Sequence, residues 1–332
     1  MRISPEHMRK VLCELFVKYK FTKEKATLIA DIFTESTLEG VSSHGINRVP
    51  LFIEHIKKGV INIDAEAEKV TSFGNIERWD GMLGPGIINA TKCTQRAVEL
   101  AKKHGMGMVA LRNTNHWMRG GTYGKQAAND GCISILFTNT KPNMPPWGGK
   151  DSKIGNNPFV VSIPRKKGHV ILDMALSQFS FGKINDYRLK GEKLPYHGGW
   201  DDNNELSNDP DKILSKERGL PVGYWKGSAL SMVLDMLATI LSGGNSTSKI
   251  SSKEIETAIS QVYICIYPEV FNDKGLQQNL IDEIIDFTHN VEPIVPGDSI
   301  YYPGERSSQT RDKNLKEGIL VNENIWKKIT EL

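Results

Sequence analysis

The connection "RKKG" at residues 165–168 is the feature that most restricts the fold of this chain. It joins two apolar runs, "NPFVVSIP" (157–164) and "HVILDMALS" (169–177), which have the composition of β-strands. A connection of four residues makes a hairpin but is too short for the helical crossover that joins parallel strands. The two strands are therefore expected to be antiparallel, and a purely parallel, doubly wound sheet is doubtful.

The usual dinucleotide-binding fingerprint does not occur in a working position. "GMGMVA" at residues 105–110 matches G-x-G-x-x-A, but a predicted helix precedes it and a predicted strand follows it. The working order is strand, loop and helix, because the helix N-terminus has to face the pyrophosphate. We therefore reject this match.

Helical spacing dominates the first 60 residues, with helices predicted to start at Ser4 and to cover 22–39 and 48–59. From about residue 71 helices and strands alternate, and strands are predicted at "GMVALRN", "CISILFTN" and "QVYICIY". Residues 183–222 are polar and rich in turn-forming residues, so we expect a surface excursion there. A strongly amphipathic helix follows and is expected at the centre of the helical part; its apolar positions are Leu230, Val233, Leu234, Leu237, Ile240 and Leu241.

Composition excludes several classes of function. The 332 residues include 42 basic and 39 acidic side chains scattered along the chain, so no basic stripe predicts a nucleic-acid partner. The four cysteines form no C-x-x-C pair, which is typical of free thiols in a reducing compartment, and we expect a cytoplasmic protein without a metal site. No segment is apolar over a length that spans a bilayer, so no membrane association is expected. H-x-x-x-H, G-x-S-x-G and the P-loop are absent, and metal hydrolysis, esterase chemistry and ATP use lose their usual support.

"GVSSHGINRVP" at residues 40–50 holds the most informative polar pair, His44 and Arg48. If this segment is helical, positions four apart share a face. Reduction of a ketone beside a carboxylate needs a proton donor at the carbonyl oxygen and a cation at the carboxylate, and these two side chains can supply both. The alternative is that His44 only starts a helix and that Arg48 is a solvated charge.

A second histidine lies in "NTNHWMRGGTYG", directly after a predicted strand. Asn115, His116 and Arg119 beside paired glycines suit a loop that binds an anion or a polar ligand, and an ordinary glycine-rich turn is the alternative. Asp173 in the strand "HVILDMALS" can orient a ribose or a histidine, and Lys226 in "GYWKG" can meet a phosphate or a carboxylate. Each of these is also a common residue at the end of a strand or helix.

Taken together, several short motifs resemble the malate/L-lactate dehydrogenase family, which is unrelated to Rossmann dehydrogenases. They are S-H-G-x-N-R at 43–48, N-H at 115–116, "GNNP" at 155–158, "DMA" at 173–175, "GYWKG" at 223–227 and "PGE" at 303–305. The stretches "GVSSHGINR", "ALRNTNHWMRGGTYG" and "MPPWGGK" are most similar to the family members that act on diketogulonate. The resemblance implies NADH-dependent reduction of 2,3-diketo-L-gulonate to 3-dehydro-L-gulonate, with NADPH as a second option for the cofactor.

The resemblance also implies a fold and an assembly. We expect an α/β protein with a largely antiparallel or mixed sheet in a cofactor domain over residues 71–224. A helical domain made by both chain ends, 1–70 and 225–332, is expected beside it. Members of the family are homodimers or larger, so a homodimer is expected.

Carried over position by position, His44 matches the proton donor, Arg48 matches a neighbour that can hold the substrate carboxylate, and His116 falls in the substrate loop. The segments that match the cofactor contacts are His169, Val170, Ile171, Leu172, Asp173, Met174 and Ala175, then Trp225 and Lys226, then Gly304, Glu305 and Arg306. Contacts at His169 could be through the backbone alone. Two alternatives stay open: a dehydrogenase of another 2-hydroxy or 2-oxo acid such as malate, lactate or ureidoglycolate, and a sugar-acid-binding protein that does not catalyse.

Overall fold

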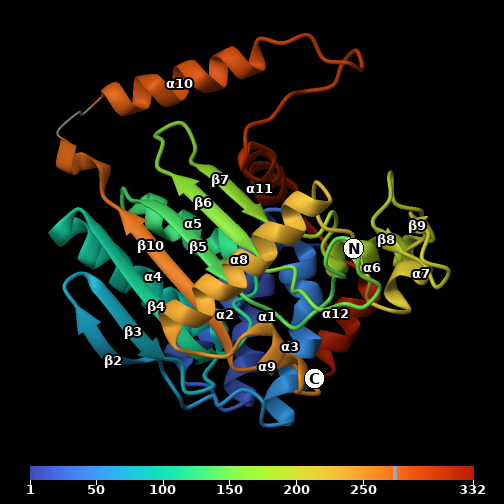
Figure 1. The fold of residues 1–332 in the computed structure, drawn as a ribbon, viewed down its shortest axis with the longest axis horizontal. Helices are drawn as coiled ribbons and strands as arrows, with labels where there is room; N and C mark the ends of the chain where they lie inside the picture. The colour runs from blue at the N-terminus through green and yellow to red at the C-terminus, as the bar shows by residue number, and fades with distance from the viewer. Residues whose placement is uncertain (272–274) are drawn as a thin grey trace.

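The computed structural model describes residues 1–271 and 275–332, and a mixed seven-stranded sheet forms its centre (Figure 1). In spatial order the strands are β2 (Glu68–Phe73), β3 (Ile76–Asp80), β4 (Met106–Thr114), β10 (Ile259–Ile266), β5 (Ile133–Thr138), β6 (Phe159–Ile163) and β7 (Val170–Met174). β3 and β4 run parallel, and each other neighbouring pair is antiparallel. The expected α/β class with a mixed, largely antiparallel sheet is confirmed.

The "RKKG" hairpin is also confirmed. β6 and β7 pair antiparallel with Ile163 opposite Val170 and Phe159 opposite Met174. β7 is the last strand of the sheet, so one of its edges has no neighbouring strand.

Helices cover both faces of the sheet. On β10, Tyr263 and Cys265 belong to the apolar core that includes α4 (Gly86–His104) and α5 (Gly120–Asn129). Val262 lies in the core on the other face, against α8 (Trp225–Ser242). Alternate residues of a strand point to opposite faces, so β10 is buried on both sides.

Both chain ends contribute to one helical part. α1 (Pro5–Lys18), α2 (Lys23–Leu38) and α3 (Val49–Lys57) pack around the phenylalanines Phe16, Phe21, Phe33 and Phe52. At the C-terminal end α11 (Glu305–Glu317) and α12 (Glu323–Thr330) join them, and β1 (Arg2–Ile3) pairs with β11 (Ile319–Leu320). The division into two domains remains a prediction. Residues 225–332 were expected in the helical part, but two elements of this range, β10 and α8, lie with the sheet.

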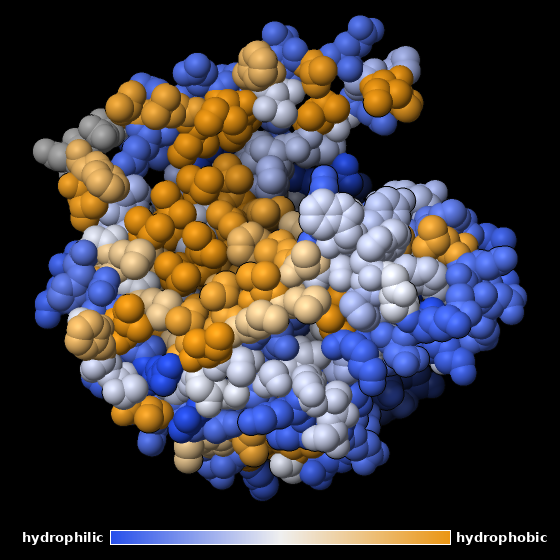
Figure 2. All heavy atoms as spheres, viewed as in Figure 1, coloured by the Kyte–Doolittle hydropathy of each residue, from blue (hydrophilic) through white to orange (hydrophobic). Residues whose placement is uncertain are grey.

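α8 differs from its expected position for a physical reason. It was expected at the centre of the helical part, but Leu234 and Ala238 face the sheet while Val233, Met236 and Ile240 are exposed. The helix is apolar on two sides, and the described residues cover only one of them. The exposed side forms much of the apolar surface in Figure 2.

Residues 178–216 are a small folded unit and not merely the expected surface excursion. They form α6 (Phe181–Lys190), α7 (Pro210–Leu214) and the paired strands β8 (Gly199–Trp200) and β9 (Leu206–Ser207). Ile184, Leu194 and Ile213 make a separate apolar core under these elements.

The remaining segments lie around β10. α9 (Thr247–Ser251) precedes it, and the short 3₁₀ helix Pro268–Phe271 follows it. α10 (Leu276–His289) then stands away from the body of the protein like an arm (Figure 1). Within the described residues, the helices are too short or too polar to cross a membrane.

Candidate active site

A cavity of about 840 Å³ lies where the helical part, the sheet and α6 meet. Residues 40–48 form one side, the loop 116–120 after β4 forms another, and the end of β7 with α6 completes the wall. The cavity contains His44, Arg48 and His116, so the three side chains named from the sequence lie at one place.

The segment that carries His44 is two short 3₁₀ turns, Ser42–His44 and Ile46–Arg48, and not the single helix considered from the sequence. Gly45 separates the turns and lies close against α2, because a Cβ on it would be 2.3 Å from Thr37 Oγ1. The same hydroxyl accepts from the Ile46 N–H (2.9 Å) and donates to the Phe33 carbonyl (2.7 Å). These contacts fix the position of both turns on α2.

His44 and His116 lie face to face, with ring centroids 5.9 Å apart and an interplanar angle of 25°. His44 Nδ1 lies 3.1 Å from the Ser43 hydroxyl. His116 Nδ1 accepts from the Met118 N–H (2.9 Å), so the neutral ring carries its hydrogen on Nε2. Each Nε2 lacks a protein partner in the described part of the chain, so both are available to a ligand.

Arg48 is a cation without an ion pair to any described residue. The charge that acts on it most is the carboxylate of Glu256, which itself accepts from the Lys141 N–H (2.8 Å). Burial lowers the pKa of Arg48, and Glu256 opposes this. A partly buried guanidinium with unused donors suits a carboxylate ligand.

The environment of His44 favours its neutral form. Burial lowers its pKa to about 4, and the positive charges of Arg48 and then Arg119 contribute in the same direction. Burial, Arg48 and His44 also hold the pKa of His116 well below its usual range. Without an anionic ligand, both imidazoles are therefore uncharged near neutral pH.

The other residues of the predicted loop have structural partners. Asn115 donates to the carbonyls of Leu83 (2.7 Å) and Gly84 (3.0 Å) and accepts from Thr257, so its amide is fully used. Arg119 lines the cavity but pairs with Glu39 at the end of α2. These contacts hold the loop in place, and the Nε2 of His116 stays available toward the cavity.

The outer edge of β7, where the sequence predicted a cofactor, is only partly occupied by the described residues. Ile171 N–H donates to Pro303 on this edge (2.8 Å), and strand N–H groups alternate between edges, so the N–H of Asp173 points to the same side. The Asp173 side chain turns away, accepts from the Gly121 N–H (2.8 Å) and is only 22% exposed. Met174 and Ala175 line the active-site cavity, so this edge leads into it.

His169 at the start of this segment has both ring nitrogens occupied. Nδ1 accepts from the Arg165 N–H (3.1 Å), and Nε2 lies 2.9 Å from Asn129 Oδ1. Its side chain holds the β6–β7 turn, which leaves only its backbone for a ligand.

The other two predicted cofactor segments lie at the two ends of β7. Gly304 has φ +96°, and a Cβ on it would be 3.1 Å from the Ile171 nitrogen. Beside it, Glu305 accepts from the Tyr302 N–H (3.0 Å), and Arg306 stacks on Tyr301. Glycine at this position lets residues 303–304 pack directly against the start of β7, so the strand edge left for a dinucleotide begins after Ile171.

At the other end of β7 the chain leads into α8. Leu176 accepts from the Val222 N–H (2.8 Å), which brings the start of α8 to this edge. Trp225 is 59% exposed there, and Lys226 has no ion pair with a described residue. All three predicted cofactor segments thus border one strand.

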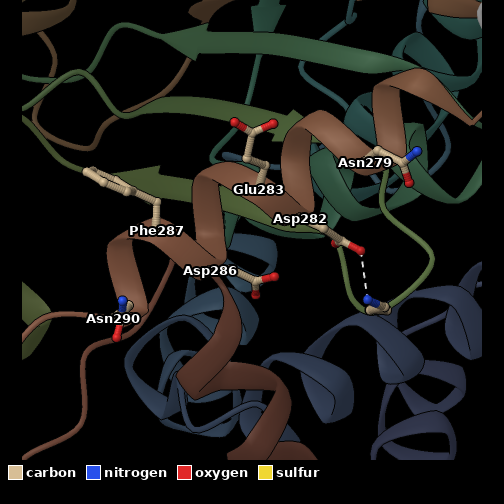
Figure 3. A pocket seen from close by; sticks show the side chains of 7 residues that line it. Asn279, Asp282, Glu283, Asp286, Phe287 and Asn290 are labelled. Carbon is tan, nitrogen blue, oxygen red and sulfur yellow. Dashed lines mark ion pairs between the residues drawn. The ribbon is translucent and has the colours of Figure 1, made fainter.

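A second cavity, of about 780 Å³, lies along α10 and is acidic (Figure 3). Asp282, Glu283 and Asp286 line it with Lys167 from the "RKKG" turn, and the dashed line in Figure 3 marks the 2.7 Å ion pair between Lys167 and Asp282. Asp282 also pairs with Arg165 (2.6 Å). The acidic lining disfavours anions, so this cavity is not where an acid substrate would bind.

Sequence reasoning missed Glu256 and the α6 residues in the active-site cavity. Glu256 lies in a polar loop before β10, and α6 lies in the segment that looked like a surface excursion. Neither has a motif or a spacing that marks it, and only the tertiary fold brings them to His44.

Comparisons with known proteins find relatives that match over the whole chain. The family model described as malate/L-lactate dehydrogenase matches residues 3–330. The 2,3-diketo-L-gulonate reductase of Citrobacter koseri is 41% identical over 333 residues, covering 100% of both chains. The protein of that name from Salmonella paratyphi A is also 41% identical with the same coverage.

Solved structures extend the similarity to the whole fold. Sulfolactate dehydrogenase from Methanocaldococcus jannaschii has a TM-score of 0.89 and 32% identity, covering 100% of this chain and 96% of that one. Malate dehydrogenase from Entamoeba histolytica has a TM-score of 0.95 and 26% identity, with coverage of 100% and 96%.

Proposed function

Because this chain belongs to the malate/L-lactate dehydrogenase family of oxidoreductases, we propose that it reduces 2,3-diketo-L-gulonate to 3-dehydro-L-gulonate with NADH. One observation carries this proposal: His44, His116 and an unpaired Arg48 share one cavity at the end of a strand whose outer edge is only partly occupied by the described residues. The full-length relatives at 41% identity support the choice of substrate.

Arg48 sets the orientation of the substrate. Its free donors hold the C1 carboxylate, which places the adjacent C2 carbonyl between the two histidines. His116 donates from Nε2 to the carbonyl oxygen while staying neutral. A nicotinamide cofactor, when bound along β7, would provide the hydride for the reduction of C2.

His44 delivers the proton to the same oxygen. Its low pKa in the free protein reflects burial and the nearby arginines, and the substrate carboxylate offsets the charge of Arg48. Substrate binding therefore raises the pKa of His44 and favours its protonation when a proton is needed. In the reverse direction neutral His44 accepts the hydroxyl proton.

The residues around β7 would hold the dinucleotide. The Asp173 N–H and the exposed side chains of Trp225 and Lys226 are available for it, and Gly304 packs against the start of the strand beside them. We favour NADH over NADPH because Asp282 forms ion pairs with both Arg165 and Lys167, two cations of the "RKKG" turn that could otherwise bind a 2′-phosphate.

The test is the loss of reduced-nicotinamide absorbance with NADH or NADPH against 2,3-diketo-L-gulonate, pyruvate and oxaloacetate. Preferred turnover of diketogulonate with NADH supports the proposal, and preferred turnover of another acid contradicts the substrate. His44→Ala should lower kcat by roughly 10²–10⁴-fold while NADH binding changes only a few-fold. Turnover within a few-fold of wild type would refute the role of His44.

We also infer that the protein is a homodimer. α10 exposes an apolar stripe with the helical spacing of one face, and α8 exposes a second one. The exposed residues are Leu276, Leu280, Ile284 and Phe287 on α10, and Val233, Met236, Leu237 and Ile240 on α8. Figure 2 shows apolar surface over α8 below the arm, and a second copy that brings the same two stripes would cover both.

Light scattering coupled to gel filtration tests the assembly. The expected mass is twice that of one chain, and Met236→Glu should shift it to one chain, whereas Val17→Glu on α1 should not. A monomeric wild-type protein would contradict the inference.

The four free thiols are consistent with the cytoplasmic location expected from the sequence.

A further inference from the structure

α6 forms a wall of the active-site cavity that the proposed mechanism does not use. Residues 181–183, Asp186, Tyr187, Leu189 and Lys190 all line the cavity, so most of this helix borders it. The reacting end of the substrate is held by Arg48 and the histidines. α6 is therefore available to the rest of the molecule.

The structure fixes α6 against the catalytic segment. Ser180 caps the helix by accepting from the Lys183 N–H (3.2 Å), and Ile184 anchors its far side in the small apolar core. On the near side a Cβ at Gly182 would lie 2.8 Å from Ser43 Cβ. The helix thus touches the residue next to His44.

Asp186 lies one turn after Gly182, on the same face of α6. Its carboxylate is partly buried and has no hydrogen bond or ion pair within the described residues. Lys183 does not pair with it, since its ammonium stacks over Tyr187 at 5.4 Å from the ring centroid. Burial raises the pKa of Asp186, and the charges of Lys183 and Lys190 oppose this.

Other polar atoms near this wall are also unsatisfied. Asn143 Oδ1 and Ser177 Oγ are buried without a hydrogen-bond partner, and both residues line the cavity. Buried polar atoms normally have partners, because an unpaired one costs about 1–3 kcal/mol. Among the described residues, the Asp186 carboxylate is thus accompanied by two further acceptors without a partner near this side of the cavity.

We propose that Asp186 determines specificity by accepting hydrogen bonds from the hydroxyl groups at the far end of a long sugar acid. A carboxylate accepts two or more hydroxyl hydrogens, and it disfavours a substrate that enters with its own carboxylate toward α6. The cavity therefore has a cationic end at Arg48 and an acceptor at Asp186. A three-carbon acid held at Arg48 carries no hydroxyl group to reach α6.

This proposal rests on the proposed function, so its test uses binding as well as turnover. Calorimetry with the oxidised cofactor present compares L-gulonate, which has the hydroxylated tail, with L-lactate, which lacks it. Wild type should bind L-gulonate at least tenfold more tightly. Asp186→Ala should weaken L-gulonate by roughly 10- to 100-fold, as expected for a hydrogen bond to a charged group, and lactate by less than twofold.

Two further variants separate recognition from folding. Asp186→Asn keeps one acceptor oxygen and should fall between wild type and Asp186→Ala. Arg188→Ala changes an exposed side chain of the same helix that does not line the cavity, and it should leave both affinities unchanged.

Equal affinity of wild type for the two acids, or equal weakening of both by Asp186→Ala, would overturn the proposal. The parallel turnover assay reports separately on the reaction. Absence of diketogulonate reduction, with the affinity contrast intact, would contradict the proposed substrate while supporting the role of Asp186.

Discussion

The pH dependence of ketone reduction should reveal the buried position of His44. Burial together with Arg48 and Arg119 places its pKa at about 4 in the free protein. The value of kcat/KM reports ionisations of the free enzyme, and reduction needs the protonated imidazole. At pH 7 only about one molecule in a thousand carries that proton.

Reduction should therefore become slower as the pH rises. We expect kcat/KM for the 2-oxo acid to fall about tenfold for each pH unit between about pH 5 and 8. In the direction of oxidation neutral His44 acts as the base, so kcat/KM should stay nearly constant over the same range. The sign follows from the pKa shift: a depressed pKa removes the acid form and leaves the base form intact.

The assay is initial-rate kinetics in both directions at constant ionic strength, with His44→Ala as the control. The variant should lose the slope because the titrating group is gone. A kcat/KM for reduction that does not change between pH 5 and 8 would refute the assignment of His44 as the proton donor. The same slope in His44→Ala would assign the titration to another group.

Three further changes test separate parts of the site. Arg48→Ala should remove about 2–5 kcal/mol of transition-state binding, which is a loss of roughly 30-fold or more in kcat/KM. It should also raise the pKa of His44 seen in the pH profile, whereas Arg48→Lys keeps the positive charge and should retain that pKa. Asp282→Asn frees Arg165 and Lys167 and should increase kcat/KM with NADPH relative to NADH. Glu283→Gln is the control, because Glu283 has no ion pair to a described residue, and it should not change this ratio. An unchanged ratio in Asp282→Asn would show that the turn does not reach the cofactor. Gly45→Ala should lower the free energy of unfolding by about 1–3 kcal/mol, because its Cβ would lie 2.3 Å from Thr37 Oγ1. An unchanged midpoint in chemical denaturation would contradict this close contact.

The parts of the fold that depend on local sequence could be predicted. The β6–β7 hairpin follows from a four-residue connection, and the strand at "QVYICIY" follows from its composition. The central place of β10 could not be predicted, because it pairs with β4 and β5, more than 100 residues earlier in the chain. Hydrophobic spacing also identified α8 as a helix but did not show that the sheet covers one of its sides and leaves the other exposed.

The same distinction applies to the candidate site. His44, Arg48 and His116 could be named from the sequence because their residue types suit ketone reduction and the motifs around them resemble those of the family. Glu256 and Asp186 could not, since an acidic residue in a polar segment is most often solvated. Their proximity to the histidines depends on long-range packing of the loop before β10 and of α6.

Two glycines show why that packing is invisible in a single sequence. Gly45 lies in a segment that was considered as a helix, and Gly182 lies just before the predicted surface excursion. A Cβ on Gly45 would collide with Thr37, and one on Gly182 would collide with Ser43. Gly45 lets the His44 segment lie against α2, and Gly182 lets α6 lie against the His44 segment. The position of His44 between α2 and α6 therefore depends on the absence of a side chain at both glycines. Gly182→Ala should displace Asp186 and His44 together and lower activity on long and short acids alike. Asp186→Ala, in contrast, should weaken only the binding of the long acid.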